Sequence, residues 1–136
     1  MPGVTLHELA QRFGAAQVFM DVDDIPAGQA FDAVILGMGE DGHTASLFPC
    51  SAQIEEGLSD GAPAVLAVEP QTAPYQRMSL SLPRLLDSRH IFLHLVGSNK
   101  LTVLNKAMAE HDVLAMPIRA FLHHPVAQVT VMYSNN

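Results

Sequence analysis

The chain has 136 residues, of which 49% are apolar and 15% are charged, and its formal net charge is −7 at pH 7. This length and composition fit one ordered globular domain, and the acidic balance argues against a nucleic-acid partner or an anionic membrane surface. A single cysteine, Cys50, and the lack of a signal-like or membrane-spanning apolar segment predict a cytoplasmic protein without an internal disulfide.

The predicted elements alternate between strands and helices along the chain. A helix is expected over residues 5–13 and a loop over 21–30, and residues 31–37 (FDAVILG) form an apolar run typical of a strand covered on both faces. Further strands are predicted over 64–69, 77–82, 90–97 and 127–133, and short helices over 83–86, 101–109 and from 117 onward, whereas residues 50–62 look irregular. We therefore predict a Rossmann-like α/β fold in a single domain over residues 1–136, with a parallel-type layered sheet, flanking helices and ligands at the carboxyl ends of the strands.

A glycine-rich segment, LGMGEDGHTASLFP (36–49), directly follows the first of these apolar strands. Its glycines, Gly37, Gly39 and Gly42, match the G-x-G-x-x-G spacing of a dinucleotide-binding turn. Pro49 leaves little room for the long helix of such a fold, and the residues after it show no second strand ending in an acidic residue at the usual spacing of about 20. The glycines therefore favour a loop with positive φ angles that approaches a ligand closely.

The same segment carries an acidic residue and a histidine, Asp41 and His43, two positions apart. Because histidine titrates near neutrality, it can take a proton from water and return it to a leaving group. A nearby carboxylate can fix the tautomer of the imidazole and stabilise its protonated form. Spacing alone equally allows Asp41 to cap the following turn and His43 to be an ordinary polar loop residue, so both interpretations stay open.

Three segments carry a family resemblance. The stretch GMGEDGHTASLFP (37–49) resembles the signature of the 6-phosphogluconolactonase family, which forms one sugar-phosphate superfamily with the glucosamine-6-phosphate deaminases. The deaminases continue with Ile-Ala-Phe-Asn-Glu-Pro at this point, so the run Thr-Ala-Ser-Leu-Phe-Pro favours the lactonase branch. RMSLSLP (77–83) is similar to the family's Arg-x-Thr-Leu-Thr strand, and HIFLHLVGSNK (90–100) is similar to its strand followed by Gly-x-x-Lys.

The resemblance implies a carboxylic ester hydrolase that needs no metal and no cofactor. Its substrate would be 6-phospho-D-glucono-1,5-lactone, hydrolysed to 6-phosphogluconate in the pentose phosphate pathway. His43 would activate the attacking water with support from Asp41, while Gly39, Gly42 and Thr44 would contact the substrate. The alternatives are a sugar-phosphate isomerase or deaminase and a non-catalytic sugar-phosphate-binding domain.

The substrate phosphate would need donors and a cation, and residues 97–100 (GSNK) offer both at a point where a predicted strand turns into a helix. Backbone N–H groups and the helix dipole favour an anion there, and Ser98 and Lys100 are the candidate ligands. Since the same dipole disfavours a cation, Lys100 is better explained by ligand binding than as a solvated lysine. Arg77 is a second anion-binding candidate, with a surface ion pair as its alternative.

Two motifs of the family are missing from this sequence, the Ser-Gly-Gly-Ser-Thr-Pro phosphate loop and Asp-Glu-Arg. The chain is therefore expected to be the C-terminal part of a longer lactonase domain, truncated or proteolysed, with a divergent remnant of the family as the alternative. Such a piece should expose a sheet edge and an apolar face, bind substrate poorly on its own and self-associate. Elsewhere, His90 and His94 are predicted to be structural, His123 and His124 have no identified partner, and Arg119 has no assigned role because the family's Leu-Pro-Ala-Ser element is altered to MPIR.

Overall fold

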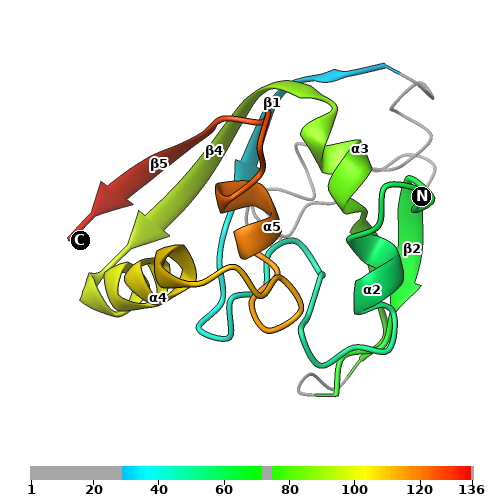
Figure 1. Cartoon of the computed structure of the whole chain (residues 1–136), viewed down its shortest axis with the longest axis horizontal. Helices are drawn as coiled ribbons and strands as arrows, with labels where there is room; N and C mark the ends of the chain where they lie inside the picture. The colour runs from blue at the N-terminus through cyan, green and yellow to red at the C-terminus, as the bar shows by residue number, and fades with distance from the viewer. Residues whose placement is uncertain (1–28, 72–74, 136) are drawn as a thin grey trace, which may run out of the picture.

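Three parallel strands form the main sheet of the protein, seen in a computed structural model that describes residues 29–71 and 75–135. The strands are β1 (Phe31–Leu36), β4 (Ser88–Val96) and β5 (Val129–Ser134), in the order β1-β4-β5 (Figure 1). The predicted parallel sheet is confirmed, and its three strands lie close to their predicted bounds. The helix predicted over 5–13 and most of the loop predicted over 21–30 lie outside the described residues.

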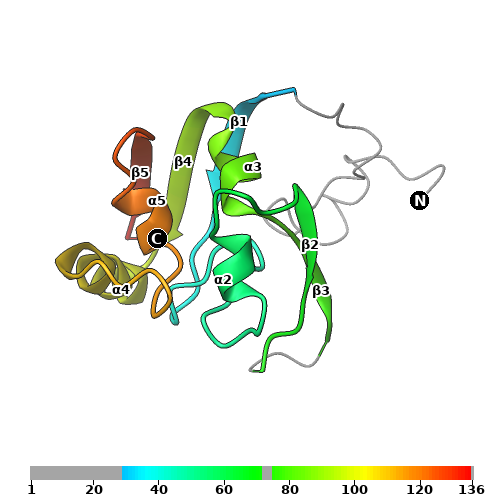
Figure 2. The same ribbon diagram turned by 45° about the vertical axis from the view of Figure 1, so that its right-hand side comes forward.

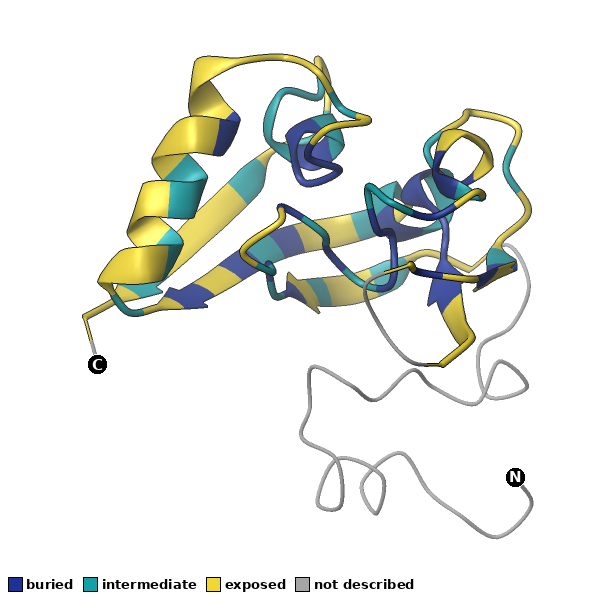
Figure 3. Ribbon diagram, turned by 90° about the horizontal axis from the view of Figure 1, so that it is seen from below, coloured by how far each residue is buried: buried dark blue, intermediate teal, exposed yellow. Residues whose placement is uncertain are grey.

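Three helices cover one face of this sheet: α3 (Leu82–Leu86), α4 (Ser98–Ala109) and α5 (Arg119–Leu122). Strand β4 shows why this face is the core, because its alternate residues Ile91, Leu93 and Leu95 are buried among the helices. Figure 3 shows the same alternation along β4, and the inner side of α4 carries half-buried residues together with the buried Ala107. The helices predicted over 83–86 and 101–109 and from Pro117 are confirmed, with α4 beginning earlier, at Ser98.

The opposite face of the sheet, which we call the outer face, is open in the described part of the chain. Its apolar side chains are those of Ala33 and Ile35 of β1, Phe92 and Val96 of β4, and Met132 of β5, with Ile35 70% exposed. The expectation that the first strand is covered on both faces is therefore wrong for the described residues. An apolar run shows that a strand can be buried on both faces, but it does not show on which face the helices pack.

A second, antiparallel pair of strands stands apart from the main sheet. It consists of β2 (Val65–Val68) and β3 (Arg77–Leu80), and both views place α3 and the one-turn α2 (Ile54–Gly57) between this pair and the sheet (Figures 1 and 2). The sequence predicts both strands but not their separation from the parallel sheet. Leu66 and Val68 of β2 pack against Phe48 in a small apolar cluster separate from the main core, and this cluster buries one face of the strand pair. Residues 50–62, predicted to be irregular, contain α2.

None of the helices in the described ranges has the length and apolar character that a membrane span requires.

Candidate active site

A cleft of about 780 Å³ opens at the carboxyl ends of β1 and β4. Its walls come from three segments that are distant in sequence: residues 37–39 and 43–46 after β1, residues 75, 77 and 78 around the start of β3, and Lys100 in the first turn of α4. In an open parallel sheet, ligands bind beyond the carboxyl ends of the strands. The position predicted for the site from strand order therefore coincides with a cavity in the structure.

The loop after β1 is held in a tight, internally bonded shape. The Gly42 N–H donates to the carbonyl of Gly39 (3.0 Å), and the Gly39 N–H donates to the carbonyl of His43 (2.9 Å). The buried Thr44 hydroxyl donates to the carbonyl of Gly37 (2.7 Å), which closes the loop onto the end of the strand. Gly42 has φ +83°, so the predicted need for a left-handed glycine is confirmed at this position.

Asp41 and His43 are brought into direct contact by this loop. The Asp41 Oδ1 atom accepts the backbone N–H of His43 at 3.0 Å and lies 2.5 Å from Nδ1 of the same residue. A carboxylate can only accept, so the imidazole donates its Nδ1 proton and keeps the lone pair of Nε2 for another partner. Asp41 thus both caps the backbone and orients the ring, so the contact that each interpretation requires of Asp41 is present.

An aromatic side chain that sequence reasoning did not select lies behind this pair. The ring of Phe48 stacks on the His43 ring, with centroids 4.2 Å apart and an interplanar angle of 25°. The guanidinium carbon of Arg77 lies 5.3 Å from the centroid of the same Phe48 ring. The only sequence signal was the place of Phe48 within the family signature, because a contact to a distant strand leaves no periodic pattern.

Two cations from different elements line the cleft, Arg77 at the start of β3 and Lys100 in α4. The Lys100 ammonium donates to the carbonyl of Met38 at 2.5 Å, so it reaches back from the helix start to the loop. Arg77 has no ion pair within residues 29–71 and 75–135, and its alternative role in a surface salt bridge has no support there. Ser98 is exposed at the start of α4 and is not among the residues that line the cleft.

Of the remaining predicted site residues, two line the cleft and one supports the loop after β1. Gly39 and Thr44 line the cleft. Gly42 lies behind it, where a β-carbon would come within 2.7 Å of the Met116 Cβ atom. The Ile118 N–H donates to the Gly42 carbonyl at 2.9 Å, so the segment before α5 supports the loop from below.

The structure places the remaining histidines that it describes outside the cleft. His90 and His94 lie in β4, as the sequence predicts, and both are exposed on the outer face of the sheet. His123, for which the sequence identified no partner, has its Nε2 atom 3.0 Å from the carbonyl of Ala107 and packs edge-on against His111. His124 accepts the backbone N–H groups of residues 126 and 127 through Nδ1.

Arg119 is another residue whose role the sequence did not reveal. Its side chain is buried and donates to the carbonyls of Lys106, Ala107 and Asp112, with Glu110 as its carboxylate partner at 3.4 Å. A cation at the carboxyl end of a helix satisfies free carbonyls and interacts favourably with the dipole. Arg119 therefore fixes the end of α4, the helix whose first turn carries Lys100.

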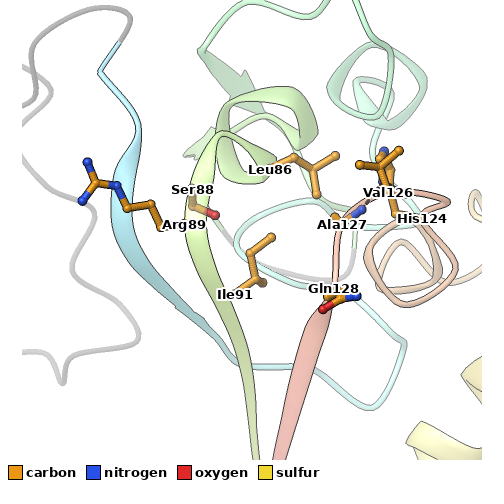
Figure 4. Close-up of a pocket in the computed structure, with 8 residues that line it drawn as sticks. All are labelled: Leu86, Ser88, Arg89, Ile91, His124, Val126, Ala127 and Gln128. Carbon is orange, nitrogen blue, oxygen red and sulfur yellow. Dashed lines mark hydrogen bonds between the residues drawn. The ribbon is translucent and has the colours of Figure 1, made fainter.

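A second cavity, of about 390 Å³, lies at the amino ends of β4 and β5, away from the cleft (Figure 4). The polar groups around it are largely engaged: the Ser88 hydroxyl donates to Leu85, His124 accepts two backbone N–H groups, and the side chain of Arg89 points away toward Asp32. In the described part of the chain, no group of three His, Cys, Asp or Glu residues is arranged to hold a metal ion.

Comparison with known proteins gives this site a family context. Residues 5–132 match the family described as glucosamine-6-phosphate isomerases/6-phosphogluconolactonase. The chain belongs to this family. The matched range includes the loop after β1 and all the segments that line the cleft, which are the segments that carry the resemblance noted in the sequence.

Relatives with a lactonase name match most of the chain. The 6-phosphogluconolactonase of Pseudomonas putida is 39% identical over 90% of the chain, and that of Rhizobium meliloti is 35% identical over 96%. A crystal structure of a 6-phosphogluconolactonase from Shewanella baltica superposes with a TM-score of 0.77 at 47% identity, covering 83% of the chain. The chain spans 51% and 57% of the two curated relatives and 48% of the Shewanella chain, which is about half the length of each.

Proposed function

We propose that the protein hydrolyses 6-phospho-D-glucono-1,5-lactone to 6-phosphogluconate, with His43 as the general base. The observation that carries the proposal is the contact between Asp41 Oδ1 and His43 Nδ1 in a loop that lines the cleft, since it leaves Nε2 free to accept a proton. The names of the relatives supply the substrate class, and the residues of this loop supply the chemistry.

The reaction follows from that arrangement. Nε2 of His43 takes a proton from water as the water oxygen attacks the lactone carbonyl carbon, which gives a tetrahedral oxyanion. When this intermediate collapses, the bond from the carbonyl carbon to the ring oxygen breaks, and the imidazolium returns its proton to that oxygen. Asp41 stabilises the imidazolium in between. A single acid–base group typically contributes about 10²–10⁴-fold, which suits an ester that already opens readily.

The phosphate of the substrate would be bound by the two cations of the cleft. Lys100 uses one of its three ammonium protons on the Met38 carbonyl, which leaves two for an anion. Arg77 offers a planar guanidinium that has no carboxylate partner in the described residues, and such groups match phosphate geometry well. The N–H groups at the start of α4, including that of Ser98, add to the positive potential there.

The deciding experiment compares His43→Ala with His90→Ala, a matched control on the exposed outer face. Hydrolysis of the lactone is followed above its spontaneous rate, using this chain and, in parallel, any longer natural polypeptide that contains it. We expect a loss of about 10²–10⁴-fold for His43→Ala and no change for His90→Ala. An unchanged rate in His43→Ala would remove His43 from catalysis. Ammonia release from glucosamine 6-phosphate, measured alongside, should stay at background.

We also infer that this chain on its own binds substrate poorly and self-associates through the outer face and edge of its sheet. Ile35, Val96 and Met132 are large apolar side chains left exposed on that face. Light scattering after size-exclusion chromatography should show species larger than a monomer, reduced in Ile35→Lys. A clean monomer with full lactonase turnover would contradict this inference. A cytoplasmic site of action belongs to the proposal and rests on the sequence.

A further inference from the structure

Phe48 occupies an unusual place relative to the cleft. It is 4% exposed and is not one of the residues that line the cavity. Its ring packs with Leu66 and Val68 of β2 in a small cluster separate from the main core. Its backbone carbonyl accepts both the hydroxyl (3.0 Å) and the N–H (3.2 Å) of Ser51. Both the ring and the backbone of Phe48 are therefore held in place from behind the site.

This fixed ring contacts two side chains that do line the cleft. His43 stacks on it at 4.2 Å with an interplanar angle of 25°, and the Arg77 guanidinium lies 5.3 Å from its centroid. The two residues come from different elements, the loop after β1 and the start of β3. Among the described residues, Phe48 is thus the one aromatic side chain whose ring contacts both of them.

The stack supplies a restraint that the Asp41 contact does not. The bond from Asp41 to Nδ1 fixes one atom of the imidazole, but the ring can still tilt about that point, and Nε2 lies on the opposite side of the ring. A flat aromatic surface parallel to the imidazole restricts this tilt. It also places a π face against the positive charge that the imidazole gains when it accepts a proton.

Arg77 needs a similar restraint. It is exposed, and a long side chain that is free in solution loses conformational entropy when it binds an anion. Within the described residues no carboxylate holds it, so the Phe48 ring is the side-chain group that it rests on. This contact with the ring keeps the N–H groups of the guanidinium available at the edge of the cleft.

We propose that Phe48 is a positioning residue that orients the His43 imidazole and the Arg77 guanidinium toward one substrate. The proposal rests on the functions proposed above for those two residues. It predicts that losing the aromatic ring affects both turnover and anion binding, because one side chain supports both groups. A residue that served only the fold would affect neither beyond the loss of folded protein.

The test compares Phe48→Leu, which stays apolar but loses the flat face, with Phe48→Tyr, which keeps the ring. Leu66→Val is the control, since it perturbs the same cluster and leaves the ring in place. Three quantities are measured: the proton chemical shifts of the His43 ring, the affinity for inorganic phosphate, and kcat and KM for the lactone. Circular dichroism checks that each variant is folded.

In the unsubstituted protein the His43 ring protons should be shifted upfield by the ring current of Phe48. Phe48→Leu should remove that shift, weaken phosphate binding several-fold, and lower kcat by about tenfold while raising KM. Phe48→Tyr should retain all three properties, and so should Leu66→Val. If Phe48→Leu does not fold, the proposal is still tested by the chemical shifts of His43 in the unsubstituted protein and by the phosphate affinity, kcat and KM of Phe48→Tyr.

Each outcome bears on the proposal. Unshifted His43 protons in the unsubstituted protein, or a Phe48→Leu variant with normal phosphate affinity, kcat and KM, would overturn it. If this chain and any longer natural polypeptide that contains it show the shift and the phosphate effect but hydrolyse no lactone, the proposed function is refuted and the positioning role of Phe48 stands.

Discussion

Replacing Gly42 by alanine tests how the loop is supported, because a β-carbon at this position would destabilise the fold both through backbone conformation and through steric overlap. The residue has φ +83°, a conformation that costs roughly 1–2 kcal/mol for a residue with a β-carbon. The new Cβ atom would also lie 2.7 Å from the Met116 Cβ, well inside ordinary van der Waals contact. Overpacking of this kind costs about 1–3 kcal/mol.

The second cost cannot be relieved by a simple side-chain rotation. The nearest atom is a β-carbon rather than the flexible end of a side chain, Met116 is itself buried, and the Ile118 N–H holds the Gly42 carbonyl. The sum of the two costs is about 2–5 kcal/mol of unfolding free energy. With a urea slope of about 2 kcal/mol/M, the middle of the typical range, the unfolding midpoint should fall by about 1–2.5 M.

Two other glycines separate the costs in the same urea titration. Gly97 has φ +96° and ψ 153°, a backbone region that is essentially restricted to glycine, and open space where a β-carbon would lie, so Gly97→Ala should lose only a conformational cost of about 1–3 kcal/mol. Gly37 has neither a left-handed φ nor a neighbour within 4 Å of that position, so Gly37→Ala should be close to neutral. Equal midpoints for the Gly42 and Gly97 variants would refute the steric argument, and a Gly42 variant as stable as the Gly37 variant would refute both parts.

Three further predictions concern the site and its support. Gly39→Ala should lower lactone hydrolysis at least about tenfold with little change in the urea midpoint, because its β-carbon would take the place of the His43 ring, which can swing away; retained activity would contradict the observed packing. Asp41→Asn should lower kcat by about 10²-fold or more with a smaller effect on KM, because the amide neither fixes the tautomer nor stabilises the imidazolium; an effect on KM alone would argue against this role. Arg119→Met should lower the unfolding free energy by about 2–4 kcal/mol, because three carbonyls lose a buried donor. Arg89→Met, which breaks an exposed ion pair, should lower it by less than about 1 kcal/mol. Equal losses in the two variants would show that the Arg119 hydrogen bonds add nothing to stability.

The parts of the fold that the sequence predicts are those set by local patterns. The alternation of Ile91, Leu93 and Leu95 with exposed residues identifies β4, and the glycines after β1 indicate the loop that carries Asp41 and His43. Strand bounds and the position of the site at the carboxyl ends of the strands follow from these signals. The contact between Asp41 and His43 is also local, so it could be proposed before the structure was known.

The features that could not be predicted depend on which segments meet in space. Burial of Phe48 against β2 and its contacts with His43 and Arg77 join three elements, and no spacing rule reports them. The buried guanidinium of Arg119 has a charge that composition assigns to the surface, and only the free carbonyls at the end of α4 explain its position. The exposure of Ile35 depends on where the helices pack.

The register of β1 against β4 sets the spacing of the residues in the candidate active site. Leu36 stands opposite Leu93, and this alignment brings the Met38 carbonyl within reach of the Lys100 ammonium a few residues beyond each strand. A slip of one residue would displace one strand by about 3.3 Å and reverse its faces, while a slip of two would keep the faces and displace it by about twice as much. Either displacement would separate the lysine from the loop. The alignment of the two strands thus sets the distance between His43, the proposed base, and Lys100, a proposed phosphate ligand. Substitutions in the sheet that alter this alignment should therefore lower activity without contacting the site.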